Sequence, residues 1–330
     1  MSRWSRRQVV QGAGAVGLGV LAGCGRWPGQ ASPPKAPRIG YVGSTRNRNP
    51  LALLDGLREF GYVEGHNLAV EWRITEGRPE RVLEAVAELV ALNVDVIVAS
   101  GVTPARAAQN ATGTIPIVIV TLSDPVESGF VASLARPGAN ITGVGSFALE
   151  LSGKQLQLLG EAIPSVARVG VLWQARHPSK AIQFREIQDA APALGIQVES
   201  LAVDTPQELA SAIQVGIQAP VDALFTLQSD LTVAERLRIL ELVGQARLPA
   251  MYDDRDWPEA GGLMSYGPNF AAMHQRAAYY VDRILKNTKP ADLPVERPTT
   301  FDFVINLRTA QALGLTIPPH ILYQATEVIQ

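Results

Sequence analysis

The sequence has 330 residues, a formal net charge of −2 and a single cysteine. A chain with one cysteine has no disulfide framework and no thiolate metal site. Its basic residues form no stripe, so charge gives no sign of a nucleic-acid partner. The length is enough for a large hydrophobic core and is typical of two domains.

The first residues have the composition of an export signal. Three arginines within the first seven residues precede an apolar run, rich in glycine and alanine, that contains no acid. The hexapeptide Ser5–Val10 resembles a twin-arginine motif with Val9 in place of the usual phenylalanine, which leaves Sec export open. The apolar run is shorter than the roughly 20 residues of a membrane-spanning helix. We therefore predict that residues 1–23 are a signal peptide.

Cys24 directly follows this run, in the tetrapeptide Leu21-Ala22-Gly23-Cys24. The tetrapeptide resembles a bacterial lipobox, in which cleavage leaves an acylated cysteine as the first mature residue. The alternative is that Cys24 is a small buried hydrophobic residue. We predict lipidation of Cys24 and a flexible tether over residues 24–37, which are rich in glycine, proline and serine. The mature protein is then expected in the periplasm or at the cell surface, anchored to a membrane by that lipid.

The segment 38–145 alternates short apolar runs with amphipathic stretches. The β-branched runs predict strands buried on both faces of a parallel sheet, at 38–43, 67–72, 94–98, 115–120 and 141–144. The stretches between them predict helices at 51–60, 80–92 and 103–112, and a short helical piece at 131–134. Thr103 is the expected N-cap of the third helix, with Pro104 in its first turn.

The same alternation of short apolar runs and amphipathic stretches begins again near position 146. Strands are expected at 166–173, 196–201, 221–227, 249–252 and 262–265, with helices at 151–163, 178–194 and 206–215 and one that ends at 246. A helix at 270–285, a strand at 300–305 and a helix at 309–313 follow, and the pattern suits this strand to an edge of either sheet. Strongly twisted open sheets rarely exceed about ten strands, so the pattern predicts two similar α/β lobes.

The expected domains are discontinuous along the chain. Lobe 1 comprises residues 38–145 and 266–297, and lobe 2 comprises residues 146–265 and 298–330. A chain that passes repeatedly between two lobes forms a hinge of several segments, an architecture that closes a cleft around a ligand. Ligands of open α/β sheets bind at the carboxyl ends of the strands, where Ser100–Thr103 and Thr121–Asp124 form small polar loops. The alternative for these hydroxyl groups is an ordinary cap or turn.

Common catalytic and metal motifs are absent from the sequence. It contains no H-E-x-x-H, no G-x-S-x-G and no phosphate-binding loop. The four histidines are scattered, and only His177 follows the end of an expected strand. Asp253 and Asp254 are neighbours on an extended chain and therefore point to opposite sides. A glycine pattern at 12–17 matches a dinucleotide motif by letter but lies in the predicted signal peptide. We expect no enzyme activity, no cofactor and no metal.

Several segments resemble the bacterial ABC-transporter substrate-binding family related to the tryptophan and aromatic-compound binding lipoproteins. They include GYVEGHN at 61–67, ATGTIPIV at 111–118, SLARPGAN at 133–140, GGLMSYGP at 261–268 and KPADLPVE at 289–296. The resemblance covers nearly the whole mature chain. It implies a type I periplasmic-binding fold, in which two Rossmann-like parallel-sheet lobes are joined by a multi-segment hinge and hold a ligand between them. It also implies delivery of a small solute to a permease and its ATPase.

Carried over to this sequence, the resemblance implies a set of ligand-binding residues in the loops of the cleft. They are Ser44, Thr45, Ser100, Gly101, Thr103, Ser123, Asp124, Gln174, Gln228, Asp230, Tyr252 and Asp253. Three arginines in or beside these loops are either clamps for a ligand carboxylate or solvated charges, namely Arg46, Arg48 and Arg176. Three aromatic residues either stack on a ligand ring or pack in the core, namely Trp173, Tyr252 and Trp257.

The expected function is an extracytoplasmic receptor of an ABC importer. A monomer would capture a small solute, with aromatic and carboxylate-bearing compounds as candidates, by closing its hinge. Its expected partners are the solute, the permease with its ATPase, and the membrane through the lipid on Cys24; no nucleic acid is expected. Two alternatives are open: a ligand-sensing partner of a membrane signalling protein, and an enzyme on the same scaffold that uses Asp124, Asp230 or Asp253.

Overall fold

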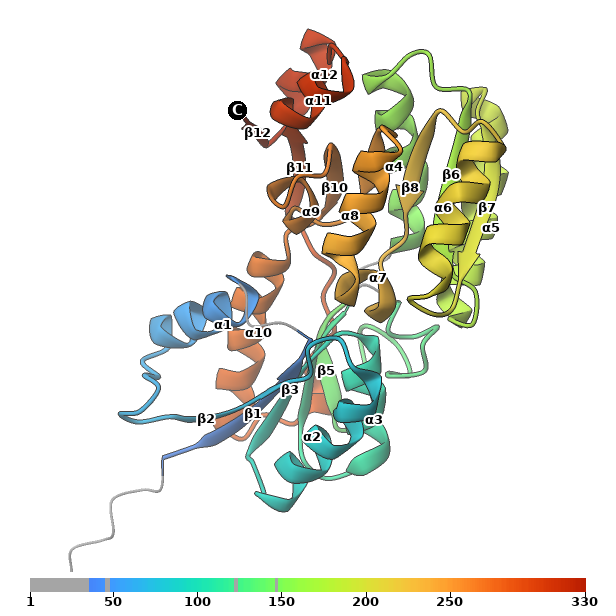
Figure 1. Ribbon diagram of the computed structural model, residues 1–330. Coiled ribbons are helices and arrows are strands. Elements are labelled where there is room, and N and C mark those ends of the chain that lie inside the picture. Colours follow the sequence, from blue (N-terminus) through green and yellow to red (C-terminus); the bar gives the residue numbers. More distant parts are fainter. Residues whose placement is uncertain (1–35, 45–47, 122–123, 146–147) are drawn as a thin grey trace, which may run out of the picture. The chain divides into compact units, whose positions relative to one another are not determined.

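The computed structural model describes residues 36–44, 48–121, 124–145 and 148–330. The contacts divide the chain into two units, Met1–Ala36 and Pro37–Gln330, and the second unit contains both sheets of the fold (Figure 1). The signal peptide, Cys24 and nearly all of the tether fall outside the described residues, so these expectations stay predictions.

The first sheet is entirely parallel, with the strand order β2-β1-β3-β4-β5. Its buried, β-branched strands confirm the expectation from the sequence, with small shifts at their ends. The strands are β1 (Arg38–Gly43), β2 (Ala69–Ile74), β3 (Val96–Ser100), β4 (Ile117–Thr121) and β5 (Ile141–Gly145).

Helices cover both faces of this sheet. Val96 and Val98 belong to a core cluster with α1 (Arg48–Glu59) and α10 (Phe270–Leu285). The alternate residues Ile97 and Ala99 belong to a second cluster, with α2 (Pro79–Ala91) and α3 (Val102–Ala111). This alternation is the period-two geometry of a strand. Helix α10 therefore completes the first lobe, although it lies late in the sequence.

The helical piece expected at 131–134 is wrong. These residues form bends and irregular backbone, in which the Ala132 N–H donates to the Pro137 carbonyl over 3.0 Å and the Arg136 N–H donates to the Ser133 hydroxyl over 3.1 Å. The apolar run is too short to offset the cost of starting a helix, and local side-chain hydrogen bonds favour a turn instead.

The second sheet has the order β12-β11-β10-β9-β8-β6-β7. It is mixed rather than purely parallel, because β11 runs antiparallel to β10. Its strands are β6 (Arg168–Gln174), β7 (Gln197–Val203), β8 (Ala223–Thr226), β9 (Ala250–Tyr252), β10 (Met264–Pro268), β11 (Phe301–Asn306) and β12 (Glu327–Ile329).

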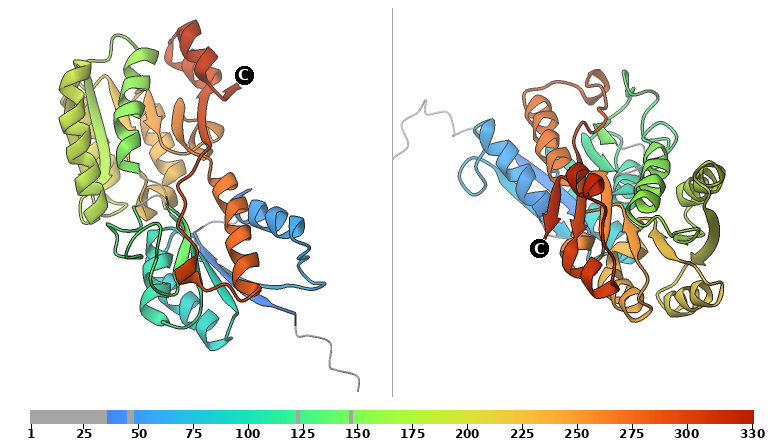
Figure 2. Two further views of the ribbon diagram at one scale, coloured as in Figure 1. Left: turned by 180° about the vertical axis from the view of Figure 1, so that it is seen from behind. Right: turned by 90° about the horizontal axis from the view of Figure 1, so that it is seen from above.

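The antiparallel pair follows from the path of the chain (Figure 2). After β10 the chain enters the first lobe as α10, and it returns through the segment 286–300 into β11. Two strands joined by such a round trip run in opposite directions. The edge position expected for 300–305 is wrong, because β12 pairs with the outer side of β11. The domain boundaries stay predictions, and β10 extends to Pro268, beyond the boundary expected at 265.

Helices also cover both faces of the second sheet. One side has α4 (Ala148–Ala162), α5 (Pro178–Ala190) and the 3₁₀ turn η1 (Ala191–Leu194), and the other has α6 (Glu208–Gln218) and α8 (Arg236–Gln245). The helix expected to end at 246 is divided into α7 (Asp230–Ala234) and α8. The remaining short elements are α9 (Asp256–Glu259), η2 (Pro290–Asp292), α11 (Leu307–Leu313) and α12 (Pro319–Gln324).

Gly143 provides a test of the packing between β4 and β5. Its φ is +139°, and a Cβ atom at this position would lie 2.2 Å from the Ile119 carbonyl oxygen. We expect Gly143→Ala to lower the free energy of unfolding by at least about 1–3 kcal/mol, because an added methyl group overpacks this site. Urea unfolding measures the change. The matched control is Gly160→Ala in α4, where a Cβ would meet only an Ile196 methyl group at 3.5 Å. Equal stability of both variants would contradict this account.

Candidate functional site

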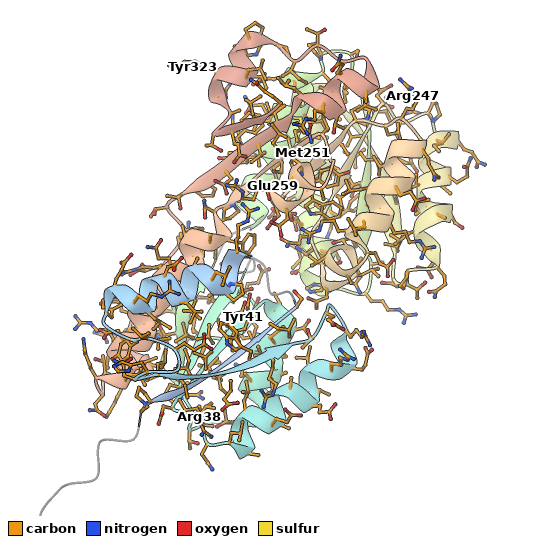
Figure 3. The ribbon with its side chains drawn as sticks, turned by 60° about the vertical axis from the view of Figure 1, so that its left-hand side comes forward. Arg38, Tyr41, Arg247, Met251, Glu259 and Tyr323 are labelled. Atoms are coloured by element: carbon orange, nitrogen blue, oxygen red, sulfur yellow. The ribbon has the colours of Figure 1, made fainter. Side chains whose placement is uncertain are left out.

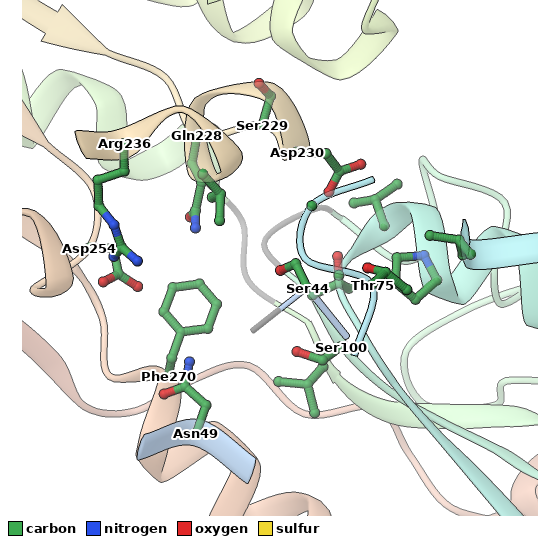
Figure 4. Close-up of a pocket in the computed structure, with 18 of the residues that line it drawn as sticks. Ser44, Asn49, Thr75, Ser100, Gln228, Ser229, Asp230, Arg236, Asp254 and Phe270 are labelled. Carbon is green, nitrogen blue, oxygen red and sulfur yellow. The ribbon is translucent and has the colours of Figure 1, made fainter. Parts of the chain in front are cut away.

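A cavity of about 130 Å³ lies where the carboxyl ends of strands from both sheets meet (Figure 4). This is the edge at which open α/β sheets bind ligands. The first lobe contributes Ser44, Thr75 and Ser100 to its wall, and the second lobe contributes Gln228 and Asp230. Three aromatic residues also line it: Tyr41 of β1, Trp257 of α9 and Phe270 at the start of α10. The cavity is therefore partly apolar and is bordered by polar groups from two lobes.

The first-lobe wall is built around the end of β3. Ser100 is the last residue of β3, and its hydroxyl lies 3.0 Å from Nε2 of His274 in α10. Gly101 has a φ of +107° and is the N-cap of α3. The N-cap expected at Thr103 is wrong, because the helix begins at Val102 once Gly101 has made the turn. The Thr103 hydroxyl instead donates to the Asp230 carboxylate across the two lobes.

The second-lobe wall is the loop between β8 and α7. Ser229 caps α7, since its hydroxyl accepts from the Thr232 N–H at 3.2 Å and the Thr232 hydroxyl accepts from the Ser229 N–H at 2.8 Å. This reciprocal pair is a capping box and fixes the first turn of the helix. Asp253 supports the same loop from behind, because its carboxylate accepts the Gln228 N–H at 3.1 Å.

Two basic side chains of the α5 start border the cavity. Lys180 is only 7% exposed and donates to the Gln183 side-chain oxygen over 3.0 Å. Burial lowers its pKa, and the nearby carboxylates Asp253 and Asp230 partly oppose that shift. Burial also lowers the pKa of His177, with a further contribution from the charge of Lys180. His177 is therefore neutral at physiological pH.

Asp253 and Asp254 are both buried, and burial raises both of their pKa values. The pKa of Asp253 rises to about 6 and that of Asp254 to about 7. The charge of Asp256 contributes further to the shift of Asp254. Asp254 faces the cavity, whereas Asp253 lies behind the wall. The cavity therefore contains a carboxyl group that changes its charge near neutral pH.

This shift predicts how stability depends on pH. A carboxyl group with a raised native pKa holds its proton more tightly when folded, so the unfolding free energy falls as pH rises through the interval from about 4 to 7. We expect Asp254→Asn, which keeps an oxygen to accept the Asp256 N–H at 2.7 Å, to remove up to about 4 kcal/mol of that fall. Urea unfolding between pH 4 and 8 measures it. Asp189→Asn, an exposed control on α5, should follow the wild type, and parallel curves for all three proteins would contradict the assignment.

A hydrogen bond and an ion pair are among the contacts that join the lobes beside the cavity. The first is the hydrogen bond between Thr103 and Asp230. The second is an ion pair between Arg48, at the start of α1, and Glu259 in α9, with Asp256 3.6 Å from the same guanidinium. Glu259 lies in the region between the second lobe and the start of α1 (Figure 3). Both contacts involve only side-chain groups, and each can separate without loss of the core of either lobe.

The structure brings together five of the residues expected from the sequence. Ser44, Ser100, Gly101, Gln228 and Asp230 line the cavity. Thr103 reaches it indirectly through its hydrogen bond with Asp230. Thr45 and Ser123 fall outside the described residues.

Four expected residues lie outside the cavity wall, and their role as ligand contacts stays a prediction. The Asp124 carboxylate accepts the N–H groups of the next turn, at 2.7 and 3.1 Å. Gln174 ends β6. Tyr252 is buried and stacks on Trp257 with ring centroids 4.4 Å apart. Asp253 supports the Gln228 loop.

Of the aromatic and arginine candidates from the sequence, some line the cavity and others lie elsewhere. Trp257 lines the cavity, whereas Trp173 stacks on Phe184 with ring centroids 4.8 Å apart. Arg176 is 85% exposed and pairs with Asp204, and Arg46 falls outside the described residues. Several lining residues were not expected, among them Tyr41, Asn49, Thr75, Lys180, Arg236, Asp254 and Phe270. Two of them carried a usable signal: Asp254 follows the strand expected at 249–252, and Lys180 comes three residues after His177, which itself lies just beyond β6.

Within the described ranges, no group of three or more His, Cys, Asp or Glu side chains could hold a metal ion. No helix in that same part of the chain is long and apolar enough to cross a membrane.

Comparison with known proteins agrees with this geometry. A solved structure of a conserved domain protein from Vibrio cholerae is 27% identical, with a TM-score of 0.83, and the match covers 89% of this chain and 100% of that one. The ABC domain from Streptococcus pneumoniae in complex with L-Trp is also 27% identical, with a TM-score of 0.82 over 89% of this chain and 99% of that one. The fold is thus that of the two-lobed binding proteins.

The family follows from the sequence match. The sequence model of the ABC transporter substrate binding proteins matches residues 45–329, and the chain belongs to this family. A relative, the tyrosine-binding protein of Clostridioides difficile (strain R20291), is 24% identical over 315 residues, which are 92% of this chain and 90% of that protein. The resemblance stated from the sequence is confirmed, and the family's description is that of a binding component rather than an enzyme.

Proposed function

We propose that this protein is the extracytoplasmic receptor of an ABC importer, and that it captures a small solute in the cavity between its lobes. The observation that carries the proposal is the cavity itself, whose wall combines polar residues from the carboxyl ends of both sheets. A ligand there contacts both lobes at once. It therefore favours the closed arrangement over an open one by its preference for the closed form.

Closure of the hinge is the physical basis of the proposed capture. Chain segments cross between the lobes after β5, after β10 and before β11, and such multi-segment hinges allow lobes to move as rigid bodies. The Thr103–Asp230 and Arg48–Glu259 contacts join the lobes, and in the proposed mechanism they separate when the lobes open. The surface ion pair is worth at most about 1 kcal/mol, so the ligand supplies most of the preference for closure.

The solute class follows from the wall and from the relatives. The printed ligands of two relatives are tyrosine and L-Trp, and the cavity offers aromatic surface from Tyr41, Trp257 and Phe270. Aromatic rings pack well against such surfaces. Aromatic amino acids are therefore the first solutes to test, followed by other small amines and carboxylates.

The proposed partners follow from the same function. A receptor that delivers solute to a permease and its ATPase benefits from a tether at the membrane, and a lipid on Cys24 followed by residues 24–37 would supply one. The proposed active form is a monomer, because the cavity is built from one chain.

A thermal-shift screen of the purified protein tests the function. A ligand that binds only the native state stabilises it by about 2.7 kcal/mol at 100 times its Kd. We expect a hit among aromatic amino acids, and a loss of at least about tenfold in affinity for Asp230→Asn, because its charge and one hydrogen bond to the ligand weaken. Asp189→Asn on the surface of α5 is the control. No stabilisation by any amino acid, amine or carboxylate would count against the proposed function.

The cross-lobe ion pair allows a second test. We expect Arg48→Gln to weaken ligand binding about two- to fivefold, the size of a partly exposed ion pair, and to raise the ligand-free radius of gyration in small-angle scattering. Arg176→Gln removes an ion pair within one lobe and should change neither quantity. Equal behaviour of the two variants would show that the Arg48 pair does not hold the closed arrangement.

A further inference from the structure

His274 lies behind the cavity wall in α10, and its side chain is completely buried. Its two ring nitrogens have different partners. Nδ1 is 2.8 Å from the Phe270 carbonyl oxygen, one helical turn earlier, and Nε2 is 3.0 Å from the Ser100 hydroxyl. Phe270 and Ser100 both line the cavity, whereas His274 does not. The imidazole thus links the start of α10 to the end of β3.

The carbonyl partner determines which nitrogen carries the proton. A carbonyl oxygen only accepts hydrogen bonds, so the proton of a neutral imidazole lies on Nδ1. Burial lowers the pKa of His274 to about 4, and the ring is therefore neutral at physiological pH. Nε2 then has a lone pair and no hydrogen, and it accepts a hydrogen bond.

Ser100 is the donor to that lone pair. Tyr41 also has its hydroxyl near Nε2, but at 3.4 Å, which is long for a hydrogen bond, whereas Ser100 is at 3.0 Å. A serine hydroxyl has one hydrogen, and here it points to His274. The Ser100 oxygen can then only accept hydrogen bonds, and its lone pairs are open to the Tyr41 hydroxyl, with which it also interacts, and to a donor group in the cavity.

The opposite wall also presents acceptors. The Gln228 side-chain oxygen is buried, lines the cavity and has no hydrogen-bond partner among the described residues. The Asp230 carboxylate accepts a hydrogen bond from the Thr103 hydroxyl and has further acceptor capacity. Its charge acts over a longer distance on His177 and Lys180, whose pKa values it raises against the larger effect of burial. A buried acceptor without a donor, such as the Gln228 oxygen, is costly, so a ligand that supplies a donor is favoured.

We infer that His274 is a positioning residue that fixes Ser100 as a hydrogen-bond acceptor, so that the ligand presents an N–H or O–H donor to Ser100, Gln228 and Asp230. This inference rests on the proposed function and adds the polarity of the bound group. A protonated amine and a hydroxyl group share the required chemistry. A ligand group that only accepts hydrogen bonds, such as an ether, is disfavoured at this wall.

The ring tautomer gives a test that needs no ligand. Long-range ¹H–¹⁵N NMR of the histidine rings separates protonated from bare nitrogens, and His274→Gln identifies the signal by its loss. We expect a ring with a hydrogen on Nδ1, a bare Nε2 and no titration between pH 5.5 and 8. A hydrogen on Nε2 of His274, or titration within that range, would overturn the inference.

Matched ligand pairs test the polarity of the cavity. L-tryptophan and L-tyrosine are compared with their Nα-trimethyl derivatives, which keep the positive charge but have no N–H, and 4-hydroxyphenylacetate is compared with its methyl ether. We expect the compound with the free donor to bind at least about tenfold more tightly in one of these pairs, the size of one good hydrogen bond. The amine and hydroxyl pairs distinguish the two sources of the donor.

Variants separate polarity from the size of the added methyl groups. In His274→Leu the Ser100 hydroxyl is free to rotate and donate. We therefore expect the free-donor compound to bind only about threefold more tightly than its methylated partner, or less. His274→Gln keeps an acceptor for Ser100 and should restore the ratio, and His320→Leu is the surface control. An unchanged ratio in His274→Leu, or equal wild-type binding of both members of every pair, would overturn the inference. If no compound binds, the result counts against the proposed function. In that case the NMR measurement of the His274 tautomer still tests the hydrogen bond between His274 and Ser100.

Discussion

The packing of α10 on the first sheet is the interaction on which the site depends. The strands on either side of this helix belong to the second sheet, so the chain has to leave one lobe, complete the core of the other and return. The same helix places Phe270 at the cavity and His274 behind Ser100. Core packing, the hinge crossings and the polarity of one cavity wall therefore all rest on sixteen residues.

The two lobes have unequal roles at the cavity. The first-lobe wall is held by the backbone turn at Gly101 and by the buried His274, so it is formed before a ligand arrives. The second-lobe wall is held by the α7 capping box and by Asp253. The Thr103–Asp230 hydrogen bond and the Arg48–Glu259 ion pair between these walls are side-chain contacts, and such contacts are weak near the surface. Two rigid walls joined by weak contacts suit a protein in which ligand binding determines the equilibrium between separated and closed lobes.

Much of the fold could be predicted from the sequence, because buried parallel strands have a distinct apolar, β-branched pattern. The short elements α9, α12 and β12 could not, since a few residues carry too little periodicity. Thr103 was a reasonable helix cap by composition, yet Gly101 made the turn two residues earlier and left the hydroxyl for Asp230. Of the site, the loops after strands were predictable. The Ser100–His274 contact was not, because it joins residues 174 positions apart and depends on tertiary packing.

The most direct measurement is a crystal structure of the purified protein with a solute that stabilises it. We predict that the solute lies between the lobes, with a donor group directed to Ser100 and Asp230 and with α10 in its present place on the first sheet. A solute bound elsewhere on either lobe, or one that leaves the cavity between them empty, would contradict the account.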